Sequence, residues 1–253
     1  MTNGFAGFPP ETLRFLRQLK RNNNREWFLA HKDIYELKVK TPMTELVLEL
    51  GEAMQEVAPE LIVDPKRAIF RIYRDIRFSA DKRPYKTHVA ARFVTRGISK
   101  NTGASLYFHI EPAEVVIAGG IYMPDPATLS SLRRHIAANW EDLRAITNQR
   151  SFRKMLGDLQ GERLVRPPSG FPADHPAIDL LRLKQFYVAQ TEPAGIVEGP
   201  KLFSRLLTLF SAMIPLVRFL NAPLKSLNIG IPDGVNGISR RGRWTSSEGF
   251  AER

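Results

Sequence analysis

The sequence predicts an α+β fold in which a central antiparallel β-sheet packs against helices from both ends of the chain. Two observations lead to this class. Apolar residues recur at helical spacing near both termini, whereas residues 68–122 show the alternation and the aromatic and β-branched content of strands. The strand-like segments follow one another with short links, and consecutive strands joined in this way form antiparallel sheets.

The first 59 residues predict a layer of helices. Asn23, three residues before Glu26, is placed to cap the second of them. Thr41 and Pro42 predict the start of the third, because proline is favoured in the first turn of a helix. The buried stripes of the first and third helices are predicted to be formed by Leu13, Leu16, Leu19, Met43, Leu46, Val47, Leu50, Met54 and Val57.

Four segments in the middle of the chain predict strands. They are 68–74, 89–96, 105–110 and 115–122, and Pro112-Ala113 predicts a hairpin connection between the last two. Because side chains alternate across a strand, one face of the second segment would carry Val89, Ala91 and Phe93, and the other would carry His88, Arg92 and Arg96. We expect the first face to pack on helices and the second to extend a basic surface.

The C-terminal half returns to helical patterns. Pro124-Asp125-Pro126 combines an N-cap with a proline at the first helical position, and so predicts a helix start. Further helices are predicted at 140–146, 152–159, 176–183 and 200–220, the last with a kink at Pro215, and a strand is predicted at 184–189. The apolar periodicity ends there, so we expect one domain over residues 1–224 and a flexible tail over residues 225–253.

Composition restricts the compartment and the chemistry. The chain has no cysteine, which excludes disulfides, thiolate metal ligands and a cysteine nucleophile. The N-terminus lacks the pattern of a secretory signal, so a cytoplasmic location is expected. The most apolar run, Leu206 to Val217, is bounded by Arg205 and Arg218 and is shorter than the ~20 residues that cross a bilayer, so we expect no membrane span.

Positive charge is concentrated in one segment. The formal net charge is +11, and the stretch from Lys66 to Lys100 holds eleven basic residues against only Asp75 and Asp81. A local excess of this kind indicates an anionic partner, and arginine offers a fixed fork of donors that fits carboxylate and phosphate. The candidate ligand-binding residues are Arg71, Arg74, Asp75, Arg77, Asp81, Lys82, Tyr85 and Lys86.

The same segment contains the pattern Arg71-x-x-Arg74-Asp75-x-Arg77-Phe78-x-x-Asp81-Lys82-x-x-Tyr85. Further notable runs are Asn24-Arg25-Glu26-Trp27-Phe28, Gly119-Gly120-x-Tyr122-Met123-Pro124 and His175-Pro176. Together they resemble the bacterial and fungal family known as domain of unknown function 2461, over about Phe8 to Leu224. The resemblance implies one domain with a shared site, and it implies no particular substrate or cofactor.

Three interpretations of the basic segment remain open. Its arginines, lysines and Tyr85 could face a cleft and hold a small phosphate- or carboxylate-bearing molecule, with catalysis if burial shifted the pKa of Lys82 or Asp75 toward neutrality. The basic sheet face could instead bind nucleic acid, with Tyr73, Tyr85 and Tyr107 as stacking residues. In the third interpretation, Asp75 and Asp81 neutralise the arginines within an internal network.

Motifs for other chemistry are absent from the sequence. It has no glycine-rich phosphate loop, no G-x-S-x-G and no H-E-x-x-H, and it identifies no cofactor. Asp75 and Asp81 could coordinate magnesium, but the neighbouring arginines oppose a cation there. His88, His109 and Glu111 could form a metal site, yet they lack its usual spacing, so no metal is predicted and histidines with satisfied partners are expected. Gly119-Gly120 could allow the backbone to approach a ligand, or could mark a bulge.

Overall fold

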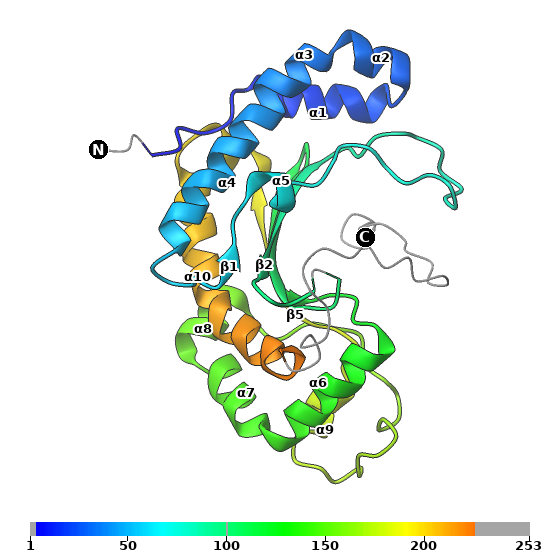
Figure 1. Ribbon diagram of the computed structural model, residues 1–253, viewed down its shortest axis with the longest axis vertical. Coiled ribbons are helices and arrows are strands. Elements are labelled where there is room, and N and C mark those ends of the chain that lie inside the picture. Colours follow the sequence, from blue (N-terminus) through cyan, green and yellow to red (C-terminus); the bar gives the residue numbers. More distant parts are fainter. Residues whose placement is uncertain (1–3, 100, 226–253) are drawn as a thin grey trace.

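A computed structural model of the chain describes residues 4–99 and 101–225 (Figure 1). Its centre is a five-stranded sheet in the order β1-β2-β3-β4-β5, with every neighbouring pair antiparallel. The strands are β1 (Leu61–Ile62), β2 (Val89–Thr95), β3 (Ser105–Ile110), β4 (Glu114–Ile121) and β5 (Phe186–Pro193). The predicted α+β class, with a central antiparallel sheet and helices from both ends of the chain, is confirmed.

The N-terminal helices are α1 (Glu11–Arg21), α2 (Arg25–Ala30), α3 (Lys32–Ile34), the π-helical turn η1 (Tyr35–Lys40) and α4 (Thr41–Met54). The cap of α2 is one residue later than predicted. Asn24 accepts the Trp27 N–H at 2.9 Å, as an N-cap residue does. Asn23 has a different role, because its side chain bonds the backbone of a segment 62 residues away.

Helix α4 begins at Thr41, as predicted, but it does not follow a loop, because the helical backbone runs without interruption from α3 through η1 into α4. Pro42 has no N–H to offer the Lys38 carbonyl four residues earlier. The Thr12 hydroxyl of α1 donates to that carbonyl instead, and the Thr41 N–H reaches back five residues to the Glu36 carbonyl. The wider π-turn therefore accommodates the proline, and a neighbouring helix satisfies the carbonyl that the proline leaves without a donor.

The C-terminal helices are α6 (Pro126–Ala138), α7 (Trp140–Thr147), α8 (Arg150–Leu156), α9 (Ile178–Leu181) and α10 (Lys201–Asn221), with the 3-10 turns η2 (Ala194–Glu198) and η3 (Ala222–Leu224). Asp125 caps α6 as predicted, accepting the Thr128 N–H at 2.8 Å. Helix α9 is shorter than predicted, and β5 is longer. Pro215 lies inside α10, which continues to Asn221. Apart from Lys225, the predicted tail lies outside the described residues.

One face of the sheet packs on α10, with α4 beside it (Figure 1). Val89, Ala91 and Phe93 point into this core, as predicted, and the Phe93 ring meets Phe210 of α10 edge-on at 5.7 Å. Burying a side chain of this size contributes roughly 1.5–3 kcal/mol to stability.

The span Lys201–Leu224 is, contrary to our expectation, long and apolar enough to cross a membrane by length and composition. Its packing on the sheet is that of a core helix, and core helices meet the same criteria of length and composition.

The segment 68–74 is not a strand of the sheet, although its composition predicted one. Its first residue ends the short helix α5 (Pro65–Ala68), after which Ile69 makes a single bridge to Ala91 of β2. The chain then leaves the sheet, and Tyr73 bridges Tyr85 instead. The aromatic and β-branched residues of segment 68–74 thus belong to a separate loop of the chain, which leaves the sheet beside β2 and returns to it there.

Candidate functional site

The candidate residues 71–86 form a hairpin that projects from the body of the protein (Figure 1). Its two arms are joined by the Arg74 N–H, which donates to the Pro84 carbonyl at 2.9 Å, and by the Lys86 N–H, which donates to the Ile72 carbonyl at 2.8 Å. Residues 75–83 form the loop between the arms. The sequence motif therefore has a defined local structure, with one end at the sheet and the other in solvent.

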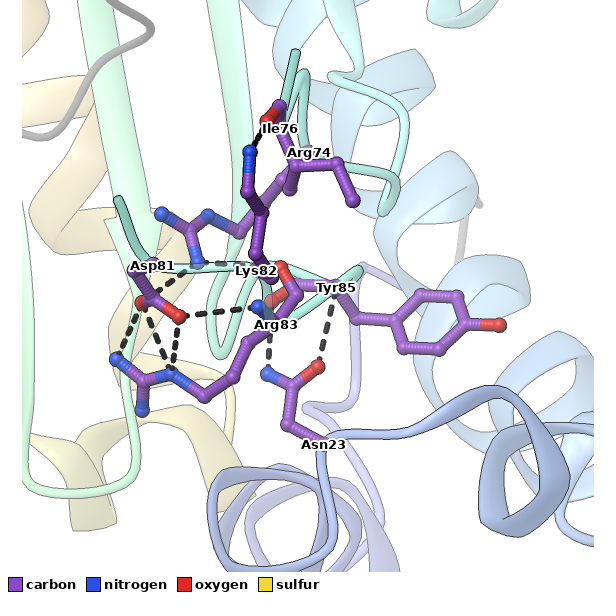
Figure 2. Close-up of polar contacts among 7 residues, drawn as sticks. All are labelled: Asn23, Arg74, Ile76, Asp81, Lys82, Arg83 and Tyr85. Atoms are coloured by element: carbon purple, nitrogen blue, oxygen red, sulfur yellow. Dashed lines mark hydrogen bonds and ion pairs between the residues drawn. The ribbon is translucent and has the colours of Figure 1, made fainter. Parts of the chain in front are cut away.

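Tyr85 fixes the hairpin to the N-terminal helices. The Asn23 side chain donates to the Tyr85 carbonyl at 2.8 Å and accepts the Tyr85 N–H at 3.0 Å (Figure 2). The Tyr85 ring is buried and stacks on Phe28 of α2 at 4.1 Å. Burial raises the pKa of the Tyr85 hydroxyl. The structure thus places this candidate ligand-binding residue in a buried anchoring position.

Asp81 closes the loop by pairing with Arg74, at the end of the first arm, and with Arg83, two residues further along the loop. Its carboxylate lies 2.8 Å from Arg74 Nη1 and 2.7 Å from Arg83 Nη2, and Arg74 also donates to the Arg83 carbonyl at 3.1 Å (Figure 2). The hydrogen bonds from Arg83, with a smaller contribution from Arg74, hold the pKa of Asp81 well below its usual range. Asp81 is therefore ionised at any physiological pH.

The rest of the loop also pairs locally. Asp75 accepts two hydrogen bonds from the Arg77 guanidinium, at 2.9 and 2.7 Å, which lower the pKa of Asp75 to about 2. Lys82 donates to the Ile76 carbonyl at 3.1 Å (Figure 2). Both carboxylates thus face guanidinium groups, an arrangement that favours the internal-network interpretation for the loop and opposes a magnesium ion.

A second polar group lies at the base of the hairpin, on the sheet face opposite α10. Strand register explains its assembly, because Arg92 is directly opposite Tyr107, Ala90 is opposite His109, and alternate residues of a strand share a face. His88 immediately precedes β2 and Glu111 immediately follows β3. We call this group the sheet-face cluster; its members are Phe70, Lys86, His88, Arg92, Tyr107, His109 and Glu111.

Two cations of the sheet-face cluster share one aromatic ring. Lys86 Nζ lies 4.9 Å and Arg92 Cζ lies 5.7 Å from the centre of the Phe70 ring. Both side chains are half-buried, and within the described part of the chain neither has a carboxylate at ion-pair distance. Burial, followed by the charge of Arg71, lowers the pKa of Lys86 to about 8, and burial also lowers the pKa of Arg92.

The histidines of the cluster surround a single carboxylate. His88 Nδ1 lies 4.0 Å and His109 Nε2 lies 3.8 Å from Glu111 Oε1, and His109 Nδ1 lies 3.1 Å from the Tyr107 hydroxyl oxygen. The Nε2 atoms of both histidines are buried without a hydrogen-bond partner. Burial lowers the pKa of His88 to about 3 and that of His109 to about 4, and it raises the pKa of Glu111. Both imidazoles are therefore neutral at physiological pH.

Sequence reasoning missed the role of these residues. It placed His88 and Arg92 on a solvated basic face and expected His109 to have satisfied partners, whereas the structure half-buries Arg92 and leaves both Nε2 atoms unbonded. The sequence did contain a signal that these side chains share one face of the sheet. The signal is the alternate spacing of His88 with Arg92, and of Tyr107 with His109 and Glu111. Of the three predicted stacking residues, Tyr85 is buried and Tyr73 is half exposed.

Gly119 and Gly120 serve packing. A Cβ atom on Gly119 would lie 2.8 Å from Met213 Sδ of α10. Gly120 has a φ of +130°, and a Cβ atom there would lie 2.2 Å from the Phe186 carbonyl oxygen of β5. The close approach that these glycines permit is to neighbouring elements of the fold. Within the part of the chain that the structure describes, no group of three or more His, Asp or Glu side chains is placed to hold a metal ion.

Comparison with models of known protein families gives a match over most of the chain. A family model described as "Conserved hypothetical protein (DUF2461)" matches residues 11–219. Neither the curated proteins nor the solved structures contain a match to the chain. The matched range includes the whole hairpin and every residue of the sheet-face cluster.

Proposed function

The chain belongs to the DUF2461 family of conserved hypothetical proteins, and we propose that it binds an anionic, phosphate- or carboxylate-bearing ligand through the sheet-face cluster, with Lys86 and Arg92 as the principal binding residues. Arg71, exposed near Lys86, adds positive charge at the rim. In this proposal Arg74, Asp75, Arg77, Asp81 and Tyr85 shape and anchor the hairpin that delivers Lys86 to the site, and the exposed Lys82 has no part in binding.

The observation that supports this proposal is the pair of half-buried cations that have no anionic partner among the described residues. Removing a charge from water costs several kcal/mol unless a counter-charge or hydrogen bonds compensate for it. The Phe70 ring compensates only partly, since a cation–π contact contributes about 0.5–2 kcal/mol. An anion that accepted hydrogen bonds from both groups would supply what the described chain does not.

Nucleic-acid binding is less well supported by the same geometry. Of the residues predicted to stack on bases, Tyr85 is buried against Phe28, and the two carboxylates of the loop pair with three of its arginines and offset two of their charges. A surface that follows a phosphate backbone needs exposed, unpaired cations over an extended path. The half-buried pair around Phe70 better fits a compact anionic group.

A thermal-shift titration tests the proposal. Sulfate, phosphate, acetate and short single-stranded oligonucleotides would be added to the wild-type protein and to the variants Lys86→Met and Arg92→Met. A ligand that binds only the native state raises the melting temperature by mass action. We expect a small anion to raise the melting temperature of the wild type and to have a several-fold smaller effect on both variants.

Two exposed residues of similar type provide matched controls. Lys82→Met removes a lysine from the same hairpin, and Arg96→Met removes an arginine immediately after the same strand. Both controls should respond to the anion as the wild type does. Without ligand, Lys86→Met should be at least as stable as the wild type, because it removes a desolvated charge and keeps the apolar stem. Equal responses in all four variants, or a response only to oligonucleotides that disappears with salt, would refute the site.

A further inference from the structure

The sheet-face cluster contains more titratable groups than a simple cation pair needs. Glu111 carries a negative charge into a region proposed to bind anions, and two imidazoles lie within 4.0 Å of its carboxylate oxygen. A fixed carboxylate would repel an anionic ligand nearby. The presence of this acidic group therefore needs a physical account, and the unbonded Nε2 atoms of His88 and His109 indicate a partner that residues 4–99 and 101–225 do not provide.

We propose that the ligand is a tetrahedral dianion of the phosphate-monoester or sulfate class, and that it binds together with one proton held by the unit His88–Glu111–His109. This inference rests on the proposed function, because it assumes that Lys86 and Arg92 hold the anion. It adds the charge class of the ligand and the proton that accompanies it.

Charge balance supports a dianion with a proton. The two half-buried cations and the ionised Glu111 together carry one positive charge, which is one short of a dianion. One proton on the unit, whether on the carboxylate or on an imidazole, raises this to two positive charges and matches the dianion. Charges buried in a protein are stable when they are balanced and hydrogen-bonded, so the dianion and the proton stabilise each other.

Hydrogen-bonding capacity supports the same ligand. A neutral imidazole has one N–H donor and one acceptor nitrogen, and an imidazolium has two donors. His88 faces Glu111 through Nδ1, and its Nε2 atom is buried and unbonded, so a protonated unit can present the His88 Nε2–H group to a ligand beside Lys86 and Arg92. A tetrahedral dianion has enough acceptor oxygens to meet two cations and an imidazole at once, whereas a planar carboxylate has two oxygens.

The surrounding charges are compatible with proton uptake. Lys86 from the hairpin acts on His88, Lys20 of α1 and Glu114 of β4 act on Glu111, and Tyr107 lies beside His109 and Arg92. Burial keeps both imidazoles neutral in the free protein, and the charge of Lys86 adds to this effect at His88. A bound dianion reverses the sign of that local field, and it therefore favours the protonated unit.

Calorimetric titration with sulfate tests the inference, because sulfate stays a dianion throughout the working range. Measurements between pH 5 and pH 7 keep Lys86 protonated, since its pKa is about 8. Uptake of one proton makes the affinity for sulfate rise by up to tenfold for each unit by which the pH falls. Nitrate, a monoanion, should bind more weakly and with little dependence on pH.

The variant Glu111→Gln supplies the sharpest comparison. The amide keeps the shape of the carboxylate and removes its charge, so it imitates the protonated unit. We expect it to bind sulfate at pH 7 at least as tightly as the wild type does at pH 5, with an affinity that no longer changes with pH. If the variant fails to fold, proton uptake by the wild type can be measured directly from the binding heat in two buffers of different ionisation enthalpy.

The outcomes separate this inference from the proposed function. Sulfate binding that depends on Lys86 and Arg92 but has the same affinity from pH 5 to pH 7 would refute proton uptake and leave the anion site intact. A pH dependence that persists unchanged in Glu111→Gln would likewise refute the assigned unit. Absence of anion binding at every pH would refute both proposals.

Discussion

The side chain of Asn23 pairs with both backbone polar groups of Tyr85, donating to its carbonyl at 2.8 Å and accepting its N–H at 3.0 Å. The amide thus bonds the Tyr85 backbone as a neighbouring strand would. It joins the connection between α1 and α2 to an arm of the hairpin that lies 62 residues later in the chain. Since Lys86 follows Tyr85 directly, the same contact fixes the backbone next to a proposed ligand-binding residue.

We expect Asn23→Ala to lower the free energy of unfolding by about 2 kcal/mol, because it leaves a partly buried donor and acceptor without partners. Urea unfolding monitored by circular dichroism measures this change. Asn22→Ala is the matched control; Asn22 is exposed and donates only to the Gln18 carbonyl, so its loss should cost about 0.5 kcal/mol or less. Equal effects of the two substitutions would contradict the anchoring role.

Asp81→Asn should loosen the hairpin loop with little effect on global stability. The substitution weakens the ion pairs of Asp81 with Arg74 and Arg83, and ion pairs at the protein surface contribute little to global stability. We expect a several-fold increase in chymotrypsin cleavage after Phe78, whose side chain is 83% exposed at the loop. Asp75→Asn is the control, because Asp75 pairs with Arg77 two residues away and does not join the arms. Similar cleavage rates in both variants would show that Asp81 does not close the loop.

The sequence predicted most of the elements because their signals are local. The stripe Leu46, Leu50 and Met54 and the alternation in β2 follow directly from helical and strand geometry. The errors arose where a distant residue decides the outcome. The Thr12 hydroxyl donates to the carbonyl that Pro42 leaves without a donor, so the helical backbone continues through Pro42. The Asn23 side chain bonds the backbone of Tyr85 and therefore does not cap the helix.

The candidate site was located only in part for the same reason. The motif from Arg71 to Tyr85 identified the hairpin, but sequence spacing could not show that Asp75 and Asp81 pair with the arginines beside them. The sheet-face cluster depends on the register between β2 and β3, which places Arg92 opposite Tyr107. That register is a long-range property, so a list of charged residues could not indicate which of them would be desolvated.

Stability should fall as the pH is lowered from about 6.5 toward 4. Burial depresses the pKa of His109 in the folded protein from its ordinary 6.5 to about 4, and that of His88 to about 3. The unfolded chain therefore binds more protons in this window, so the free energy of unfolding rises with pH and is lost on acidification, by at most about 1.4 kcal/mol per pH unit for each histidine.

Urea unfolding at pH 7, 6 and 5 in sulfate-free buffer measures this slope. His109→Gln should make the slope shallower, because glutamine does not titrate. Glu111 acts in the opposite direction, since burial raises its pKa, and the lowered pKa values of Asp75 and Asp81 affect stability only below about pH 4. An identical slope in the wild type and in His109→Gln would show that this imidazole is not held neutral by the fold.

Asn221, at the end of α10, makes the most completely bonded buried polar contact among the described residues. Its amide donates to the Thr95 hydroxyl oxygen at 2.9 Å and to the Ala104 carbonyl at 3.0 Å, and its oxygen accepts the Ala104 N–H at 2.8 Å. These bonds tie the helix to the connection between β2 and β3. Asn221→Ala should therefore lower the free energy of unfolding by about 3 kcal/mol, because two backbone groups and a hydroxyl lose a partner in a site that excludes water.

Chemical denaturation of Asn221→Ala beside Asn148→Ala checks this expectation. Asn148 is exposed at the end of α7, so its replacement should change stability by no more than about 0.5 kcal/mol. Since Thr95 ends the strand that carries Arg92, loss of the Asn221 contacts should also weaken sulfate binding in proportion to the disorder of that strand end. A variant as stable as the wild type would mean that water replaces the amide at no cost, and that the apolar face of α10 and the Arg205–Glu192 ion pair are enough to hold the helix to the sheet.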